Sequence, residues 1–574
     1  MSGTMILPGV YIDVLSEGLI APGQVTVGNL GVVGTAAKGA LNQPTLLSTY
    51  NDALAFFGSY DSFIDPNDPT RRRQNSLTLV RALELAFNNG ATTVYAMRVG
   101  AASAAPATAT LQSTSGQCAA LTANSPGTWG NALTTVVAAP AASDVLIAED
   151  IVTLTSGQAI AKQITLGHAS KASGRNRVII RQVNGTVAVP AIVNAAPTAG
   201  QVEFSGNTLN FGDNLVAGDV VTADYAVDPT TFVKVTVTLG TTSEVYLVTD
   251  GNMLVSKVND PQSRSNLVTA TAGTHVAEHP TAPQSLPFTG GDDGASFNGY
   301  NDASFYDPLL DVDAHIILAA GQSAAQAGAA LDAHCQKAST DVYKRDRIAI
   351  VGSDFASTSL SAPTPIQIGT YVDTLIGNTL GSDRVVFVAP GIQATSTAAA
   401  DQPLNPITVP GAYAAAVIAG MLAAMPPHIS LTNKTVAVAN LEVKFNNAQL
   451  TELVQNRVTA LEIERGIRVL RGETTDDGAF REITTRRIVD YAKYGVRAAA
   501  SPYIGLLNND RVRAALRATI NSFLKSMLDD EMLVGYGLDV TATRDQQIAG
   551  IVQVTITLQP VFSINFIKVT MILS

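Results

Sequence analysis

The sequence predicts a multidomain protein of α/β plus α+β class: an α/β core domain with an all-β insertion, then a C-terminal α+β domain, with an extended strand arm at each end. Two patterns carry this prediction. Apolar strands alternate with helices in residues 28–138 and again in 286–395, whereas residues 139–285 are rich in Thr, Val, Gly and Asn. The chain has 574 residues, which is more than one hydrophobic core usually organises.

The α/β core is predicted from short apolar runs, each followed by a segment with helical periodicity. Such alternation favours a mainly parallel sheet covered by helices. We expect Asn51 to be the N-cap of the first helix and Gly58 its C-terminal stop. The expected strands are 30–34, 93–99, 315–318, 347–351 and 384–388, and the expected helices are 52–57, 77–88, 324–337 and 366–380.

The inserted domain at 139–285 is predicted from alternating runs such as 177–181 and 234–239. Turn residues separate these runs, as at 205–207 and 212–214. The pattern is typical of a β-sandwich or barrel. Because the α/β pattern resumes after the insertion, we expect its two ends to lie close together on the host domain.

Residues 396–545 contain longer helices with charged faces and are predicted as the C-terminal α+β domain. The clearest helix spans 510–528, and Arg513 and Arg517 lie off its apolar stripe. The stripe consists of Val512, Leu516, Ile520, Phe523 and Met527. Residues 440–530 are the most charge-dense part of the chain, which predicts either a solvated face with helix-supporting ion pairs or a charged docking surface for a second protein.

Both ends of the chain contain predicted strands in which polar and apolar residues alternate. We call these ends the N-terminal arm, 1–27, and the C-terminal arm, 546–574. Neither strand has an obvious partner in its own domain, so each is expected to pair with the sheet of another copy. In the N-terminal arm the strand residues are Val10, Tyr11, Ile12 and Val14. In the C-terminal arm they are Val552, Val554, Ile556 and Leu558 and, after Pro560, Ile567, Val569, Met571 and Leu573.

The composition excludes several classes of protein. A net charge of −11 argues against nucleic-acid binding, which needs a basic footprint. Charged residues make up only 14% of the chain, against roughly 25% in typical domains, so we expect partners to cover much of the surface. We expect no signal peptide, since the first residues contain neither a basic region nor a long apolar run. We also expect no membrane insertion, since the longest apolar helix candidate, 412–425, is too short to span a bilayer. It is predicted as a buried, Ala-rich helix.

The sequence contains no recognisable catalytic, cofactor or metal motif. The six histidines have no metal-ligand spacing, and no nucleophile elbow or phosphate-binding loop is present. The acidic run at 291–294 is predicted as a tight turn and not as a calcium loop. Cys118 and Cys335 are predicted as two free thiols in small apolar sites, with a disulfide formed after release from the cell as the alternative.

Several segments together resemble the tail sheath proteins of contractile bacteriophages and related contractile injection particles. The most specific short match, at 125–131, holds the only tryptophan, Trp129. The other matching segments are 8–12, 32–39 with Pro44, 288–294, 427–434, 471–475, 487–490 and Asn508. The resemblance covers both α/β halves, the C-terminal third and both arms, whereas 139–285 matches only as a variable, outward-facing domain.

The resemblance implies a structural role without cofactors. Sheath subunits stack as rings of six around an inner tail tube in an extended, metastable state, and contraction drives the tube through the host envelope for genome delivery. In that family both arms add strands to neighbouring subunits, and we expect hinges at 21–23 and near 541–547. The C-terminal domain of the family faces the tube, which makes Arg511, Arg513 and Arg517 candidate tube contacts.

The resemblance also implies the partners and the location. The partners are further copies of the chain, the tail tube protein, the baseplate and the tail terminator or neck proteins. The location is the virion tail, assembled in the host cytoplasm. A sheath of a non-phage injection particle or bacteriocin is the alternative, because the sequence does not separate it from a phage sheath. A hydrolase with an α/β core is disfavoured, because fold class alone carries no function.

Overall fold

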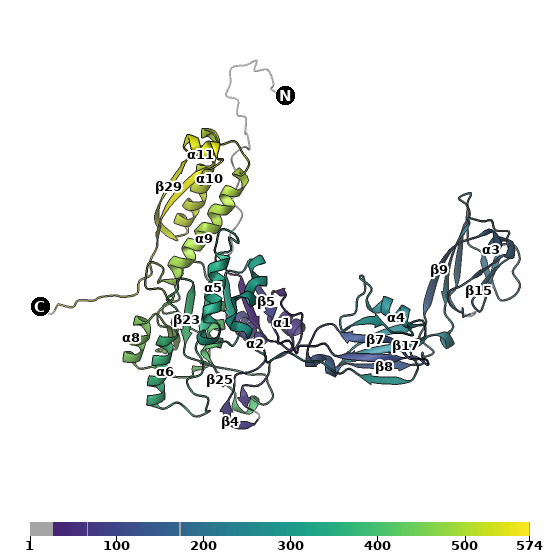
Figure 1. The fold of residues 1–574 in the computed structure, drawn as a ribbon, viewed down its shortest axis with the longest axis horizontal. Helices are drawn as coiled ribbons and strands as arrows, with labels where there is room; N and C mark the ends of the chain where they lie inside the picture. The colour runs from purple at the N-terminus through teal and green to yellow at the C-terminus, as the bar shows by residue number, and fades with distance from the viewer. Residues whose placement is uncertain (1–26, 66, 172–173, 573–574) are drawn as a thin grey trace, which may run out of the picture. The chain divides into compact units, whose positions relative to one another are not determined.

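The computed structural model describes residues 27–65, 67–171 and 174–572 and divides into two compact units (Figure 1). The first unit contains the described residues up to 36, then 41–101 and those from 295 onward. The second unit contains 37–40 and 102–294. The predicted N-terminal strand at 10–14 and the hinge candidate at 21–23 lie outside the described residues.

An eight-stranded sheet organises the first unit, in the order β2-β5-β1-β21-β22-β23-β27-β28. Its six inner strands are parallel, as predicted, and the edge strands β2 and β28 are antiparallel to their neighbours. The strands are β1 (Leu30–Gly34), β2 (Pro44–Leu47), β5 (Val94–Arg98), β21 (Ile316–Ala319), β22 (Ile348–Gly352), β23 (Val385–Ala389), β27 (Thr459–Ile463) and β28 (Ile467–Val469).

Helices cover both faces of this sheet and match the predicted pattern (Figure 1). They are α1 (Tyr50–Phe57), α2 (Leu79–Asn88), α5 (Ala329–Ala338), α6 (Pro365–Gly377), α7 (Gly411–Ala424) and α8 (Asn447–Gln455). Smaller strands complete this region: β3 (Ile64–Asp65), β4 (Asp68–Arg72), β24 (Ile392–Ala394), β25 (Ile407–Val409) and β26 (Asn440–Leu441). No boundary is found at the predicted position 396, because β27 and β28 extend the same sheet.

The start of α1 differs from the prediction. Its N-cap is Thr49 and not Asn51: the Thr49 hydroxyl accepts from the backbone N–H of Asp52, and the Asp52 carboxylate accepts from the backbone N–H of Thr49 at 2.9 Å. This reciprocal pair is a capping box, which satisfies two N–H groups at once and therefore outcompetes a single cap. The predicted stop at Gly58 is confirmed, with φ at 80°.

The Ala-rich helix α7 is buried almost all round, as predicted. It packs against α2 and the strands β22 and β23, and small side chains allow the backbones to approach closely. A Cβ added at Gly420 would lie 2.3 Å from the carbonyl oxygen of Ala86. Among the described residues, no helix is long and apolar enough to cross a membrane.

The second unit is built almost entirely of β-structure. Two sheets, β18-β17-β8-β20 and β19-β7-β6, surround one core with helix α4 (Gly251–Val258). Two further sheets, β12-β11-β16-β9 and β10-β15-β14-β13, form a second core with α3 (Ser156–Ala161). The predicted strands at 177–181 and 234–239 are β11 (Arg177–Arg181) and β17 (Val233–Leu239).

The remaining strands of this unit follow in chain order. They are β6 (Thr108–Gln112), β7 (Gln117–Ala123), β8 (Thr134–Ala138), β9 (Ile147–Thr153), β10 (Gln163–Thr165), β12 (Val187–Ala188), β13 (Ala191–Val193), β14 (Gln201–Ser205), β15 (Thr208–Phe211), β16 (Val220–Ala226), β18 (Thr242–Val248), β19 (Val268–Ala272) and β20 (Gln284–Pro287). The unit is wider than the predicted 139–285, because β7 and β8 pair with strands from the later part of the insertion and β6 pairs with β7. Its ends meet as expected: the backbone N–H of Ala105 donates to the carbonyl oxygen of Asp292 at 3.1 Å.

Candidate functional site

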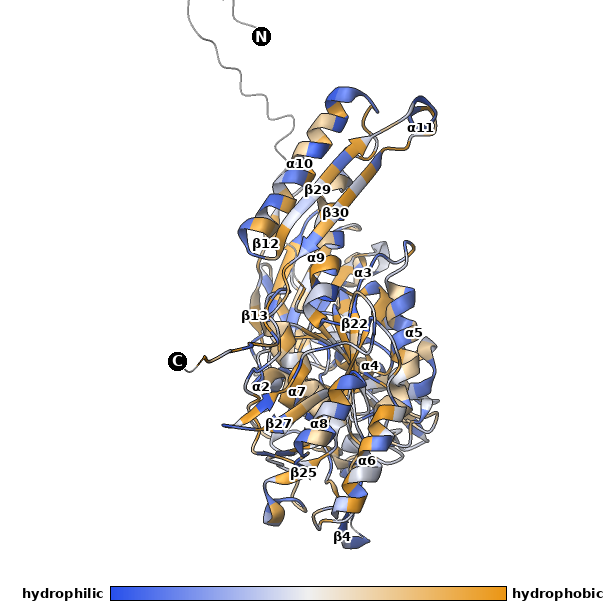
Figure 2. Cartoon of the chain, turned by 90° about the vertical axis from the view of Figure 1, so that its left-hand side faces the viewer, coloured by the Kyte–Doolittle hydropathy of each residue, from blue (hydrophilic) through white to orange (hydrophobic). Residues whose placement is uncertain are grey.

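The C-terminal end of the chain forms two helices covered by a β-hairpin, which we call the C-terminal module (Figure 2). Its elements are α9 (Ile483–Ala500), α10 (Asp510–Asp529), β29 (Leu533–Thr541) and β30 (Gln553–Pro560). Four of the five residues of the predicted stripe on α10 are buried against α9 and the hairpin, namely Leu516, Ile520, Phe523 and Met527, whereas Val512 is only half-buried. The short helix α11 (Arg544–Ile548) lies in the turn of the hairpin and begins with a capping box at Thr543, within the predicted hinge.

Apolar and polar residues alternate along β30, as predicted (Figure 2), and the burial of its side chains alternates with them. The side chains of Val552, Val554, Ile556 and Leu558 pack toward the helices, whereas the alternate residues of β30 are exposed. The expectation that this strand has no partner in its own domain is wrong. β30 pairs with β29 of the same chain, for example Val554 with Val540. The glycines at 535 and 537 stand between the inward residues of β29 and have low strand propensity, which hid the strand from sequence analysis.

The two-stranded hairpin covers α10 more fully than α9. The strand β29 packs along α10, while an apolar groove of about 330 Å³ separates α9 from β30. The groove is lined by Val489, Ala492, Lys493, Val496, Arg497, Ile556 and Leu558. Within the described part of the chain, no third strand pairs with the hairpin, so its edge strands keep backbone groups available for a further strand.

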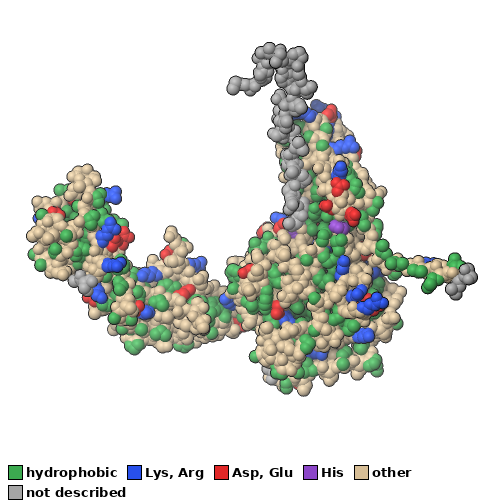
Figure 3. Space-filling model, turned by 180° about the vertical axis from the view of Figure 1, so that it is seen from behind, with side chains coloured by type: hydrophobic (Ala, Val, Ile, Leu, Met, Phe, Trp, Pro, Cys, Tyr) green, Lys and Arg blue, Asp and Glu red, His purple; other side chains and the backbone are tan. Residues whose placement is uncertain are grey.

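Beyond Pro560 the chain continues as an exposed apolar segment, residues 561–572, which we call the C-terminal segment. The predicted strand at 567–573 is not formed in its described residues, because an extended segment needs a neighbouring strand to satisfy its backbone. Ile567, Val569 and Met571 are 82%, 72% and 88% exposed. Figure 3 shows this segment projecting from the body with mainly hydrophobic side chains.

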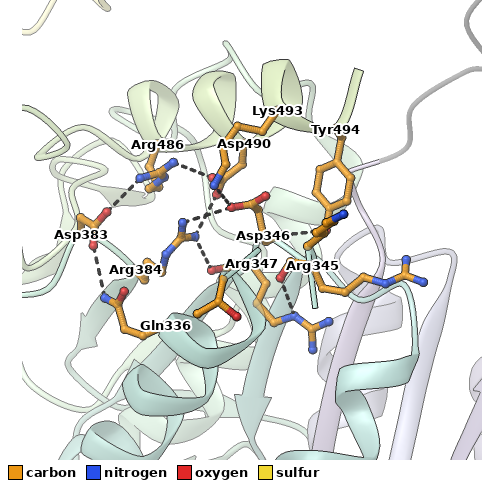
Figure 4. A network of polar contacts seen from close by, with 12 residues as sticks. Gln336, Arg345, Asp346, Arg347, Asp383, Arg384, Arg486, Asp490, Lys493 and Tyr494 are labelled. Carbon is orange, nitrogen blue, oxygen red and sulfur yellow. Dashed lines mark hydrogen bonds and ion pairs between the residues drawn. The ribbon is translucent and has the colours of Figure 1, made fainter. Parts of the chain in front are cut away.

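A buried ionic network fixes α9 to the sheet of the first unit (Figure 4). The Asp346 carboxylate, at the N-terminal end of β22, pairs with Lys493 and Arg497 of α9 and with Arg384 at 3.3 Å. Burial by itself raises the pKa of Asp346, but the hydrogen bonds from Lys493 and Arg497 outweigh it and hold the pKa below its ordinary value. Asp346 is therefore the anionic centre of this attachment.

The same network continues along the first turns of α9 (Figure 4). Asp490 accepts from Arg384 at 3.3 Å and from Arg486 at 2.6 Å, and Arg486 also donates to Asp383 at 2.9 Å. Arg487 donates to the carbonyl oxygens of Leu422, Met425 and Pro426, which lie at the C-terminal end of α7. A cation there interacts favourably with the helix dipole, although burial lowers the pKa of Arg487 to about 10.

The charge density of 440–530 therefore has a third explanation that sequence analysis did not consider. Arg486, Arg487 and Asp490 are 4–6% exposed, and Glu473 is fully buried. These charged side chains form buried ion pairs and hydrogen bonds that join elements of the fold, which we call internal joints. They form neither a solvated face nor a docking surface. Sequence reasoning missed them because their partners lie far away in the sequence, with Arg384 and Asp490 separated by 106 positions.

The predicted tube-facing arginines lie in the first half of α10. Arg513 donates to the Asn508 side chain at 2.8 Å and pairs with Asp510, so it stabilises the start of its own helix. Arg517 donates to the carbonyl oxygen of Leu538 at 3.4 Å, and Arg511 is exposed. The three side chains therefore lie on one helix, and Arg513 and Arg517 each bond to a different neighbouring segment.

The two cysteines are free thiols, each fully buried in the core of a different unit. The Cys118 thiol donates to the carbonyl oxygen of Leu111 at 3.3 Å, and burial raises the pKa of Cys335 to about 12. A disulfide requires an accessible thiolate. The disulfide considered from the sequence is not formed within this fold, and the burial of both thiols favours the free-thiol prediction.

The acidic run at 291–294 lies in a loop whose carboxylates are occupied by hydrogen bonds. Asp292 accepts from the backbone N–H of Gly294 at 2.7 Å, and Asp293 accepts from the backbone N–H of Thr128 at 2.6 Å. Within the described ranges, no group of three or more His, Cys, Asp or Glu residues could hold a metal ion.

The C-terminal module and the overall fold both match known proteins. Residues 475–574 match the family model for the phage tail sheath C-terminal domain. The chain is similar to a sheath tail protein from Desulfitobacterium hafniense, with 15% identity, 97% of each chain covered and a TM-score of 0.55. It is also similar to a sheath tail protein from Listeria innocua, with 12% identity, 94% of each chain covered and a TM-score of 0.58. No curated protein sequence gives a significant match. The resemblance found in the sequence is thus confirmed: residues 475–574 match the phage tail sheath C-terminal domain, and the chain has the fold of sheath tail proteins.

Proposed function

We propose that this chain is the structural subunit of a contractile tail sheath. Copies polymerise as stacked hexameric rings around an inner tail tube in an extended, metastable state. Contraction then drives the tube through the host cell envelope for genome delivery. The role needs neither catalysis nor a cofactor. The family match of the C-terminal module and the fold of the whole chain support this proposal.

The groove between α9 and β30 is the observation that carries the proposal furthest. A strand added beside β30 would extend the sheet across α9 and place its inward side chains over Val489, Ala492 and Val496. An acceptor of this kind fits a donated strand with alternating apolar residues. The C-terminal segment has that pattern in Ile567, Val569 and Met571, and the N-terminal segment has it at 10–14.

The proposed exchange has a clear energetic basis. Each main-chain hydrogen bond contributes about 0.5–1.5 kcal/mol net, and a strand forms several at once. Burying a side chain such as Ile567 or Met571 adds about 1.5–3 kcal/mol. The alternation also fixes the register, because a slip by one residue would expose the apolar face. Linked strands can therefore keep subunits connected while the bodies move.

The ionic network has a mechanical role in this proposal. It joins α9 to β22 and β23 through Asp346, Arg384 and Asp490. A pull on the hairpin is therefore transmitted to the α/β body instead of bending α9 away from it. This supports movement of the first unit as one piece, with the links between subunits provided by the strand arms.

The remaining partners follow from the same proposal. Further copies of the chain bind through the arms, the tail tube faces the C-terminal module, and baseplate and terminator or neck proteins meet the ends of the sheath in the virion tail. Arg511, on the exposed side of α10, is the first of the three arginines to test as a tube contact. A sheath of a non-phage contractile particle would use the same parts, and no described feature favours it.

Negative-stain electron microscopy of the purified chain tests the proposed assembly. The full chain should form hollow tubes at high concentration. Variants lacking residues 2–20 or 561–574 should remain folded monomers, with circular dichroism spectra like that of the full chain. If both truncated chains still build tubes, strand exchange through the arms is wrong.

A further inference from the structure

A second groove, of about 600 Å³, lies between α8 and the β27–β28 hairpin. Its apolar lining comes from Leu450, Val454 and Leu470. Charged side chains stand around it: Glu462 on β27, and Arg471 and Arg481 beyond β28. The C-terminal segment forms part of the same groove through Asn565 and Phe566, so the groove begins where this segment leaves the body.

Asn565 fixes the segment at this point. Its side-chain N–H donates to Glu482 Oε1 at 3.0 Å, and Arg471 donates to the same oxygen at 2.7 Å. The next residue, Phe566, lies at the groove but is 85% exposed, so its ring does not fill the cavity. A tethered apolar segment thus stands beside an apolar groove that it does not occupy.

The composition of the segment matches the groove. Beyond Phe566 it exposes Ile567, Val569, Met571 and Ile572, and such a run of exposed apolar side chains is a liability in an unassembled protein. Its only charged side chain is Lys568. The groove offers the Glu462 carboxyl group to this cation, whereas Arg471 and Arg481 are already paired with Glu482 and Glu473. Burial and the neighbouring Glu464 raise the pKa of Glu462, and a cation beside it would lower that pKa again.

We propose that in the unassembled subunit this groove holds the subunit's own C-terminal segment, residues 566–572, with Lys568 paired to Glu462. Phe566 and the following apolar side chains then lie over Leu450, Val454 and Leu470, and the strand is withheld from other copies until assembly releases it. The short tether favours the subunit's own segment over that of a second copy, because it provides a local concentration in the millimolar range. The release step rests on the proposed sheath function, whereas the docking itself does not.

Disulfide trapping in the full-length chain tests the docking directly. Thr451 lines the groove on the exposed side of α8, and Val569 lies in the segment. The two native thiols are buried, so the double variant Thr451→Cys/Val569→Cys has one reactive pair. Under mild oxidation at a concentration too low for assembly, it should form a disulfide within the monomer.

The matched control moves the first cysteine by one residue. Glu452 is exposed on the same helix but does not line the groove. The variant Glu452→Cys/Val569→Cys should form its disulfide about tenfold more slowly, because the docked segment holds residue 569 in the groove, on the side of α8 that carries Thr451 and not Glu452. Equal rates for the two pairs would overturn the proposal. A disulfide formed only between two chains, at a rate that rises with protein concentration, would also overturn it and identify a second copy as the occupant.

A charge exchange tests the Lys568–Glu462 pair. In the Thr451→Cys/Val569→Cys background, Glu462→Lys should slow trapping about twofold to fivefold, the range expected for one partly exposed ion pair. Adding Lys568→Glu should restore the original rate. No effect of the single change, or no restoration by the second, would show that this pair does not form.

The consequences for assembly separate this proposal from the sheath function. Glu462→Lys should shorten the lag before tubes appear, because the strand is released earlier. If the full chain forms no tubes but trapping occurs as expected, the sheath function fails and the docking stands. If tubes form through the arms but trapping does not distinguish Thr451 from Glu452, the docking fails alone.

Discussion

The Nη1 atom of Arg384 lies 3.3 Å from Oδ2 of Asp490, and the two side chains are only 6% and 9% exposed. Arg384 precedes β23 and Asp490 lies on α9, so this contact joins the α/β sheet to the C-terminal module. Burial by itself raises the pKa of Asp490, and Arg384 and Arg486 oppose that effect. The joint is stable only while all of these charges are paired.

Removing one partner of this buried network should therefore lower the free energy of unfolding more than removing a surface ion pair does. Asp490→Ala leaves Arg384 and Arg486 with an uncompensated buried charge, and the free energy of unfolding should fall by on the order of 3 kcal/mol. Urea unfolding followed by circular dichroism measures this. Asp510→Ala removes an exposed ion pair with Arg513 and should cost at most about 1 kcal/mol. Equal losses in the two variants would contradict the role of the joint.

The close packing of α7 against α2 gives a second prediction. A Cβ at Gly420 would lie 2.3 Å from the Ala86 carbonyl oxygen, so Gly420→Ala should destabilise the chain by about 1–3 kcal/mol. Gly369 in α6 has no atom within 4 Å of an added Cβ. Gly369→Ala should be neutral or stabilise by up to about 1 kcal/mol through helix propensity. The midpoint temperature of thermal unfolding should fall for Gly420→Ala and should rise or stay unchanged for Gly369→Ala.

Glu442 makes the stability depend on pH. Burial raises the pKa of Glu442 to about 7, because the effect of burial is larger than the opposite effect of the ion pair with Arg72. The folded chain then binds a proton more tightly than the unfolded chain, so the contribution is fully present below about pH 4.5 and is lost as the pH rises to about 7. Glu442→Gln should flatten this decline in urea unfolding between pH 5 and 7.5. An exposed substitution on α8, Glu452→Gln, should leave the slope unchanged.

The buried thiols predict slow chemical labelling. Neither Cys118 nor Cys335 is exposed, so a thiol reagent such as Ellman's reagent should modify both only as fast as the chain unfolds. In denaturant both should react within the mixing time. Non-reducing electrophoresis of assembled particles should give a band at monomer mass, and a dimer band sensitive to reductant would contradict the assignment of free thiols.

Much of the α/β core could be predicted from the sequence. The apolar strands at 30–34, 347–351 and 384–388 and the buried helix at 412–425 are confirmed, because an element buried on all sides leaves a continuous apolar run in its own sequence. The stripe on α10 was visible for a similar reason, since one buried face imposes helical periodicity.

Features that depend on distant partners could not be predicted. Two other features were missed for local reasons: the cap at Thr49, whose partner Asp52 lies only three residues on, and β29, in which two glycines weaken the strand signal. The extent of the second unit depended on the pairing of β7 with β19 and of β8 with β17 and β20, which lie far along the chain. The exposed groove beside β30 and the groove at α8 exist only once α9, the hairpin and β28 are packed.

The sequence by itself determined the class of fold, the apolar character of the C-terminal end and the resemblance to sheath proteins, because these are properties of local pattern and composition. The tertiary structure alone decided that β30 already has a partner, that the charges of α9 are internal joints, and where the C-terminal segment leaves the body. The physical reason is that pairing and burial of charge are settled between residues up to hundreds of positions apart, at distances that no sequence pattern encodes.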